Sequence, residues 1–540
     1  MATGGQQRVS ARATGVVGIA VLCSRVLGLI REIIFAGLFG ASRNMDAFLT
    51  AFRAPNMLRD LFAEGALSTA FVTTFSKKIA AEGDQSAWRL ANKIATLTTV
   101  FMSAITLVGV ALAPWIVAIL APGFDAEKAA LTVVLARVMY PFILLVSLAA
   151  LAMGMLNAKN VFGVPALASS FFNIGSIIGG VFFGWWIDPS FGTRALVGLA
   201  IGTLIGGFLQ LAVQIPSLFR IGFVLRPDFR WRDEGVRKVL QLMGPAVVAA
   251  SAVQVNVLIN TIFASHLEDG AVSWLNIAFR LMQLPLGIFG VAVATVTLPL
   301  VSRSMALGDT SQFRSALAHA LRLVMLLTIP SAIGLIILAD PIIRLIYEHG
   351  RFTTFATQQT AGALQCYAIG LVAYSADKVL VPAFYALDKR YLPMLVSFSS
   401  IVVNSCLSWF LAFNLQLGHR GLALSTSMVA ITNFLFLYSM MRRYTSRLET
   451  SAMILTVFKL LLAGLGLAAT CWVARSVFFE ANVSAPDWLN AIGMAITIAV
   501  GCAVFYGAAI LLRVAELRDI VDLVRRRFSG RGGSPNRPGD

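Results

Sequence analysis

The chain has 540 residues, of which 58% are hydrophobic and only 13% are charged, and its mean hydropathy is +0.80. A soluble globular protein is about half apolar and a quarter charged, so this composition excludes a string of soluble domains and is typical of a polytopic α-helical membrane protein. The formal charge of +17 is explained by basic residues in cytoplasmic loops and does not indicate nucleic-acid binding.

Long, mainly apolar runs predict about fourteen transmembrane helices, because a membrane-spanning helix needs about 20 such residues. In chain order the predicted spans are 14–38, 46–76, 91–120, 131–156, 161–187, 194–216, 239–264, 271–302, 313–339, 355–385, 391–414, 420–441, 453–478 and 487–513. Unbroken runs of this kind exclude a transmembrane β-barrel, whose strands show short alternating segments. The connections are too short to hold a soluble domain.

The distribution of basic residues predicts the orientation of these helices. If the N-terminus is inside, the inner segments contain Arg8, Arg12, Lys77, Lys78, Arg89, Lys93, Arg220, Arg226, Arg230, Arg232, Arg237, Lys238, Arg303, Arg314, Lys389, Arg390, Arg442, Arg443, Arg447, Arg525, Arg526, Arg527 and Arg531. The outer loops have few basic residues and contain Asp125, Glu127, Glu268, Asp269, Glu480 and Asp487. Cytoplasmic loops carry the excess of Lys and Arg, so both termini are predicted to be cytoplasmic.

A weak internal repeat runs through the first twelve spans. The segment IFA occurs at 34–36 and 262–264, AFR occurs at 51–53 and 278–280, and Pro and Gly recur at matching positions in PWIVAILAPG and PIIRLIYEHG. Six spans per repeat is an even number, so the two halves should be related by an axis along the membrane normal, as in transporters with parallel repeats.

The repeat predicts an N-lobe over 1–220 and a C-lobe over 221–447, with a substrate path between them. The last two helices, over 448–513, are an addition to the repeat, and residues 514–540 form a basic cytoplasmic tail rich in Gly, Pro and Arg.

Charged residues occur within several predicted spans, where each costs a few kcal/mol unless it faces protein or water. They are Arg25, Arg31 and Glu32 in the first span, Asp46, Arg53, Arg59, Asp60 and Glu64 in the second, Arg280 in the eighth, and Asp377 and Lys378 in the tenth. At 100° per residue, Asp46, Arg53, Asp60 and Glu64 share one helical face. Pairing among themselves is one explanation, especially for Arg31 with Glu32 and for Asp377 with Lys378.

An anionic ligand is the other explanation, and it is favoured for Arg25, Arg53, Arg59 and Arg280. These arginines outnumber the acidic partners near them in the sequence. The planar guanidinium binds phosphate or carboxylate through two parallel hydrogen bonds and stays charged. The sequence therefore predicts a phosphate-bearing substrate.

The motifs of common enzymes are missing from this sequence. It has no glycine-rich phosphate loop of the Walker type and no nucleophile elbow. The four histidines and five cysteines are scattered without the spacing of metal ligands or of a disulfide framework. A transporter without a cofactor or bound metal is expected, with any driving energy supplied by ion or potential gradients or by consumption of the substrate outside.

Several long motifs resemble a known family. They are SRVLGLIRE at 24–32, FGAS at 39–42, DAF at 46–48, FRAPNMLRDLFAEGALSTAF at 52–71, APGF at 121–124, LNAKNVFGVPALA at 156–168, QLMGPA at 241–246, INTIFAS at 259–265, VSWLNIAFRLMQLPLGIFGVA at 272–292 and YEHGRFT at 347–353. These segments look like the MurJ (MviN) lipid II flippases of the multidrug/oligosaccharidyl-lipid/polysaccharide exporter superfamily. The resemblance covers nearly the whole chain up to about residue 445.

The resemblance implies a fold of fourteen helices that exports lipid-linked peptidoglycan precursor from the inner to the outer leaflet, with the last two helices lining a groove for the lipid tail. The family's cavity arginines fall on Arg25, Arg31, Arg59 and Arg280, with Arg53 as a further basic residue. Its acidic residues fall on Asp46 and Glu64, and Asp60 and Lys378 are expected to act with them in gating or ion pairing. Multi-pass insertion in a bacterial inner membrane and function as a monomer near cell-wall synthesis enzymes are also expected.

Two departures from the family concern acidic residues. Beside the eighth-helix arginine and three positions after it, where some relatives have acids, this chain has Phe279 and Gln283. The sodium-site acids of some members have no counterpart, and Asn404 and Ser408 are the nearest polar residues. A sodium site of that type is therefore not expected, and the coupling ion stays open.

Four alternatives differ in the chemistry that they require. An exporter of another polyprenyl-diphosphate-linked oligosaccharide would use the same arginines, whereas an exporter of cationic drugs would need carboxylates and aromatic residues in its cavity. A membrane transferase acting on such a lipid would need a carboxylate or metal cluster, which the short loops do not offer. A scaffold without transport activity would not need charged residues inside its spans.

Overall fold

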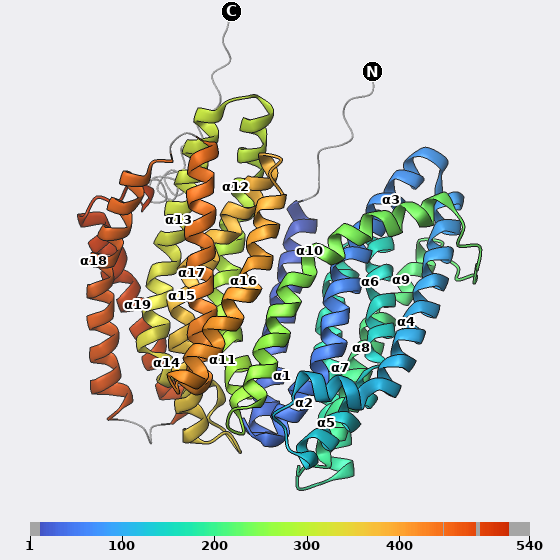
Figure 1. The fold of residues 1–540 in the computed structure, drawn as a ribbon, viewed down its shortest axis with the longest axis horizontal. Coiled ribbons are helices and arrows are strands. Elements are labelled where there is room, and N and C mark those ends of the chain that lie inside the picture. Colours follow the sequence, from blue (N-terminus) through green and yellow to red (C-terminus); the bar gives the residue numbers. More distant parts are fainter. Residues whose placement is uncertain (1–10, 446–447, 482–485, 518–540) are drawn as a thin grey trace, which may run out of the picture. The chain divides into compact units, whose positions relative to one another are not determined.

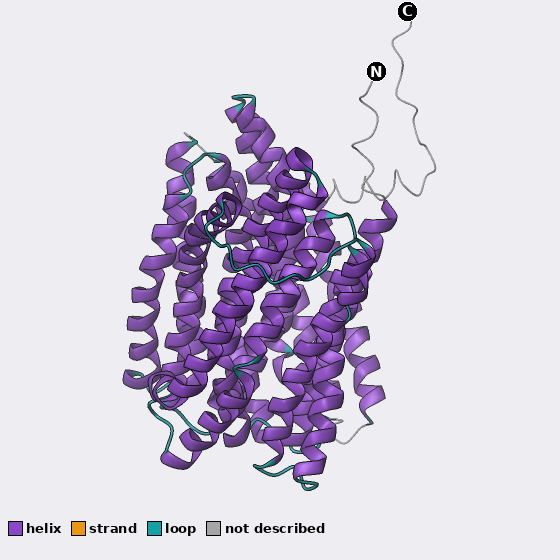
Figure 2. Ribbon diagram, turned by 90° about the vertical axis from the view of Figure 1, so that its right-hand side faces the viewer, coloured by secondary structure: helices purple, strands orange, loops and turns teal. Residues whose placement is uncertain are grey.

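A computed structural model describes residues 11–445, 448–481 and 486–517, and every regular element in these ranges is a helix (Figure 2). The chain divides into two compact units. The first contains residues 1–273 and 349–356, and the second contains residues 274–348 and 357–540. The tail expected over 514–540 lies outside the described residues from 518 onward.

The first unit is built from helices α1 to α10 (Figure 1). Their bounds are α1 Ala11–Phe39, α2 Arg43–Leu58, the π-helix η1 Arg59–Leu67, α3 Ser68–Glu82, α4 Asp84–Leu120, α5 Ala126–Met139, α6 Phe142–Ala158, α7 Gly163–Ile187, α8 Ala195–Ala212, α9 Ile215–Arg220 and α10 Glu234–Ser265. Helix α10 packs on η1, α3 and α4, so this unit extends beyond residue 220, where the repeat predicts the N-lobe to end.

The second unit contains the remaining helices, apart from the first turns of α11 and α15. Their bounds are α11 Ala271–Pro285, η2 Leu286–Gly290, α12 Val291–Ala306, α13 Thr310–Ile337, α14 Ala339–Tyr347, α15 Thr354–Ala386, α16 Tyr391–Trp409, η3 Phe410–Asn414, α17 Gly418–Tyr444, α18 Thr450–Ala474, η4 Arg475–Phe479 and α19 Asp487–Leu511. Its core joins α13 and α15 to the last two long helices through residues such as Leu321, Phe384, Leu460 and Phe505.

Among the described residues, eleven helical stretches are long and apolar enough to cross a membrane, or up to twelve if the two halves of α10 form one span. The halves of α10 are bent by 42°, and Pro245 lies shortly before the bend. About fourteen spans were expected. The first two expected spans, which correspond to α1 and to α2 with η1 and α3, are not among the eleven, and they are the spans with the most charged residues.

Close packing of α7 against α8 depends on glycines spaced four residues apart. Gly198, Gly202 and Gly206 follow this spacing on α8, and a Cβ added at Gly202 would lie 2.3 Å from the backbone nitrogen of Gly180 on α7. Small residues at this spacing let the backbones of membrane helices approach each other. The glycines therefore decide how closely these two helices can pack.

Replacing Gly202 with alanine should destabilise the protein by about 2 kcal/mol, because the new methyl group forces two packed backbones apart. Gly334→Ala in α13 is the matched control, since nothing lies within 4 Å of its added Cβ, and there the greater helix propensity of alanine should give a small gain in stability. Thermal unfolding in detergent would measure both variants. Equal midpoints would contradict the packing argument.

The second expected span is not a continuous α-helix. Pro55 lies inside α2, where it removes one backbone N–H donor, and the chain changes from α- to π-helix at Arg59. Because the π-helix has a different number of residues per turn, the uniform 100° spacing that was used to place Asp46, Arg53 and Asp60 on one face does not hold beyond Arg59. Single π-helical turns inside α-helices are frequent at functional sites.

Two tight backbone contacts in the first unit match the internal repeat. A Cβ on Gly123 would lie 2.4 Å from the carbonyl oxygen of Ser265, and a Cβ on Gly350 would lie 2.3 Å from that of Gly37. Gly123 and Gly350 are repeat counterparts, as are Gly37 and Ser265, each of which follows an IFA segment. The end of each repeat's IFA helix therefore meets a glycine of the other repeat, which supports the repeat as a structural feature.

Candidate functional site

Arg25 and Arg31 lie on α1, which packs against α7. Arg25 is exposed, whereas Arg31 is half-buried and its Cζ atom lies 5.2 Å from the centre of the Phe172 ring. Asn173 donates a hydrogen bond of 3.1 Å from Nδ2 to the carbonyl oxygen of Ser24. This bond fixes the turn of α1 that carries Arg25. The sequence did not predict that Asn173 positions α1, because it is a single asparagine in an apolar span.

Arg59 is held by its neighbour at the start of η1. Its Nε and Nη2 atoms donate to Asp60 Oδ1 at 3.2 and 3.0 Å. Asn56 Nδ2 and Gln254 Nε2 both lie 3.4 Å from Oδ2, the other carboxylate oxygen of Asp60. Asp60 therefore orients the guanidinium of Arg59. Arg53 is half-buried on α2, and the side chain of Glu64 lies outside the described residues.

The other predicted residues lie in the second unit, on α11 and α15. Arg280 and Lys378 are both exposed, and Asp377 is half-buried with a buried Oδ1 atom. In the part of the chain that the structure describes, no ion pair joins Asp377 to Lys378. Pairing between these two neighbours, which the sequence left open, is therefore not present.

Asn404 and Ser408 of α16 lie in a buried hydroxyl network. The Oγ atoms of Ser408 and Ser425 are 2.7 Å apart, and Ser425 Oγ also lies 3.4 Å from Asn404 Oδ1. Among the described residues there is no group of three or more His, Cys, Asp or Glu side chains placed to hold a metal ion.

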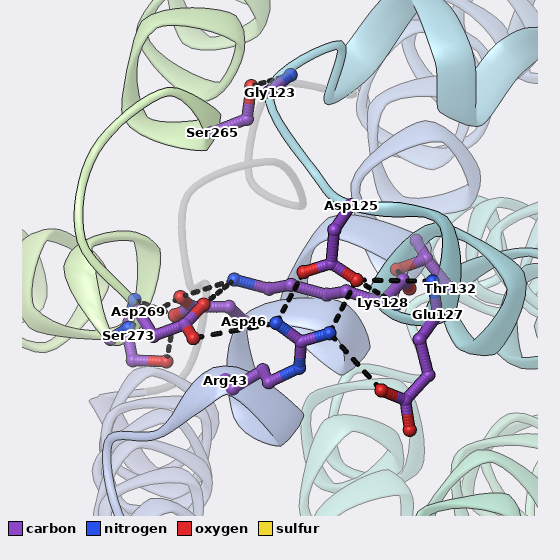
Figure 3. Close-up of polar contacts among 11 residues, drawn as sticks. Arg43, Asp46, Gly123, Asp125, Glu127, Lys128, Thr132, Ser265, Asp269 and Ser273 are labelled. Carbon is purple, nitrogen blue, oxygen red and sulfur yellow. Dashed lines mark hydrogen bonds and ion pairs between the residues drawn. The ribbon is translucent and has the colours of Figure 1, made fainter.

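Asp46 lies at the centre of a buried network in the first unit (Figure 3). Its side chain is 1% exposed, and its carboxylate accepts hydrogen bonds from the backbone of Gly270 at 2.7 Å and from Ser273 N and Oγ at 2.9 and 2.7 Å. Lys128, which is 4% exposed, donates to Asp46 at 3.2 Å and to Asp269 at 2.8 Å. Its ammonium group also lies 4.0 Å from the centre of the Phe124 ring.

Arg43 extends this network to the surface. It forms an ion pair and two hydrogen bonds with Asp125, and it lies 3.6 Å from both Glu127 and Asp269. Asp125 also caps α5 by accepting from the backbone N–H groups of Glu127 and Lys128. The hydrogen bond from Arg43 is the main reason that the pKa of Asp125 is lowered to about 2.

The lowered pKa of Asp125 predicts a pH dependence of stability. Because the folded pKa lies below the unfolded value of about 3.9, the contribution of the Arg43–Asp125 pair should be present above about pH 4 and lost as the pH falls toward 2. Asp125→Asn keeps a capping side chain but removes the charge. The difference in unfolding midpoint between this variant and the unaltered protein should shrink from pH 5 to pH 2.5, and a constant difference would refute the assignment.

Sequence reasoning missed Lys128 and Arg43 as partners of Asp46 and Asp125. The available signal was that Lys128 is one of the few basic residues in the predicted outer segments. Asp46 was expected to act in gating or ion pairing; the ion pair with Lys128 is present, and a gating role stays a prediction.

An all-helical fold with many candidate spans defines a polytopic membrane protein, and solved transporters share this fold. A multidrug resistance MATE family transporter of the MOP superfamily, in its inward-facing conformation, matches with a TM-score of 0.66 and 14% identity over 79% of this chain and 96% of its own. A structure of lipid II flippase MurJ, in its inward closed conformation, matches with a TM-score of 0.74 and 26% identity over 92% of this chain and 99% of its own.

The sequence comparisons identify the family. The sequence model of the family described as "Lipid II flippase MurJ" matches residues 35–487. The probable lipid II flippase MurJ of Buchnera aphidicola is 36% identical over 423 residues, which are 78% of this chain and 81% of the relative. The lipid II flippase MurJ of Burkholderia cenocepacia is 36% identical over 428 residues, 78% of this chain and 82% of the relative. The chain therefore belongs to the MurJ family of flippases, which are transporters and not enzymes.

Proposed function

We propose that this protein moves lipid II, the lipid-linked peptidoglycan precursor, from the inner to the outer leaflet of a bacterial cytoplasmic membrane. The observation that carries the proposal is the family match over residues 35–487, which includes Arg53, Arg59 and Arg280. In this proposal the protein works by alternating access, with both termini in the cytoplasm and as a monomer close to the enzymes of cell-wall synthesis.

The diphosphate of lipid II is bound by Arg25, Arg31, Arg53, Arg59 and Arg280. Guanidinium groups suit this task because they form paired hydrogen bonds to phosphate and do not lose their charge. The pair of Arg59 with Asp60 supports the proposal, because Asp60 keeps the guanidinium in one orientation while the substrate is absent. The lipid tail stays in the bilayer beside α18 and α19.

Asp46, Asp60, Glu64 and Lys378 are assigned to gating or ion pairing. The buried pair of Asp46 with Lys128 supports this assignment for Asp46, since breaking it without a substitute partner is costly. That cost would keep Asp46 paired with Lys128 until the substrate is bound.

Depletion of the protein in its host tests the proposed function. An added enzyme that cannot cross the membrane cleaves only outward-facing head groups, so it reports the leaflet that holds the precursor. On depletion, the peptidoglycan precursor should accumulate in a protected pool. If the precursor stays accessible in a strain that lacks other candidate flippases, lipid II is not the substrate.

A further inference from the structure

Residues 221–233 form an ordered strap between α9 and α10, visible in Figure 1 as the green segment beside α4. Asn92 of α4 holds the strap on both sides of Leu225: its Nδ2 donates to the carbonyl oxygen of Val224 at 3.1 Å, and its Oδ1 accepts from the N–H of Arg226 at 2.8 Å. The N–H of Asp228 donates to Thr96 Oγ1 at 3.0 Å. The strap therefore has a defined position along α4.

Both ends of the strap are also anchored. At its start, the buried Phe223 ring packs against Trp88 at 5.6 Å between centres. At its end, Asp233 pairs with Lys93 at 2.6 Å and caps α10 by accepting from Gly235. These contacts turn one side of the strap toward α4 and leave the other side exposed.

The exposed side combines apolar and basic side chains. Phe229 is 65% exposed and Leu225 is 61% exposed, although a short loop in water would not be expected to present both. Arg226 and Arg232 are exposed beside them, and within the described ranges neither has an ion-pair partner. Arg230, by contrast, is neutralised by two hydrogen bonds to Asp228 at 3.0 and 2.9 Å.

The position of the strap along α4 places it at a membrane interface. Lys93 is the last charged residue of α4, and residues 94–120 contain none. An uncharged helical stretch of this length is enough to cross the hydrocarbon core, which is about 30 Å thick. Because the strap binds Asn92 and Thr96, on either side of this boundary, it lies at the depth of the lipid head groups.

We infer that the strap is a binding site for anionic phospholipid head groups. Arg226 and Arg232 bind the phosphate, and Leu225 and Phe229 enter the interface between head groups and acyl chains, where aromatic side chains are enriched. Basic residues close to a membrane surface attract anionic lipid. The site is separate from the arginines assigned to lipid II, and its test needs no lipid II.

Titration of the purified full-length protein with phosphatidylglycerol, followed by native mass spectrometry, tests this inference. The double variant Arg226→Gln/Arg232→Gln should lose the tightest phosphatidylglycerol site, with affinity reduced about 25-fold, since each basic residue contributes about 1 kcal/mol and 1.4 kcal/mol is tenfold. Phosphatidylcholine should not compete for this site. Phe229→Ser should weaken binding without removing its preference for the anionic lipid.

Arg442→Gln/Arg443→Gln is the matched control, because it removes two exposed arginines from the end of α17. This control should bind phosphatidylglycerol as tightly as the unaltered protein does. The unfolding midpoint of every variant should equal that of the unaltered protein. An unchanged affinity in the strap variant, as expected if the strap contacts a soluble protein instead, would overturn the inference. An equal loss in the control would overturn it too, because the effect would then be one of net charge.

Discussion

Replacing Lys128 with methionine should destabilise the protein by about 3 kcal/mol and lower its unfolding midpoint by several degrees. The substitution removes the ammonium group that lies between Asp46 and Asp269 and leaves the carboxylate of Asp46 buried without a cation. Removing one member of a buried ion pair is costly because the remaining charge has lost both its partner and water. Thermal unfolding of the purified protein measures the effect.

Two further variants separate the loss of the buried pair from other causes. Lys159→Met is the matched control, because Lys159 pairs with the exposed Asp84 at 2.5 Å, and exposed pairs contribute only about 0–1 kcal/mol. The double variant Asp46→Asn/Lys128→Met should recover part of the stability, since the amide carries no charge and its one oxygen can still accept from Ser273. If both lysine variants unfold at the same midpoint, the Asp46–Lys128 pair does not stabilise the fold.

Substituting Arg280 with alanine should abolish export of the precursor while the protein stays at its normal level. A charge-assisted hydrogen bond contributes about 1.5–3 kcal/mol, so the loss of one arginine should weaken binding of the diphosphate about 10- to 150-fold. The leaflet assay described above, applied to cells that express only the variant, should show precursor in the protected pool. Arg25→Ala should act in the same direction, because Arg25 is also exposed and assigned to the diphosphate.

Arg303→Ala controls for the loss of an exposed arginine, because Arg303 lies at the end of α12, outside the proposed binding set. It should leave export unchanged. Arg280→Lys should restore export only in part, because an ammonium group keeps the charge but not the two parallel donors. Normal growth and export with Arg280→Ala at normal protein levels would show that this arginine does not bind the substrate.

The sequence by itself determined the class of the protein and approximately where its long helices begin and end. Apolar runs predict membrane helices well because each span must satisfy its own backbone in lipid, and α4, α7, α13 and α17 all lie close to their expected positions. The same physics makes charges such as Arg25 and Arg280 conspicuous inside spans. These residues could be chosen as site candidates without knowing what surrounds them.

Only the tertiary structure decided which residues meet. Asp46 and Lys128 are 82 residues apart, as are Arg43 and Asp125, and Asn92 holds a strap more than 130 residues away. Hydrophobic periodicity says which side of a helix is apolar but not which helix packs against it, so these pairs left no signal in local sequence. The π-helix at η1 escaped prediction too, because it changes the helical turn on which face assignments depend.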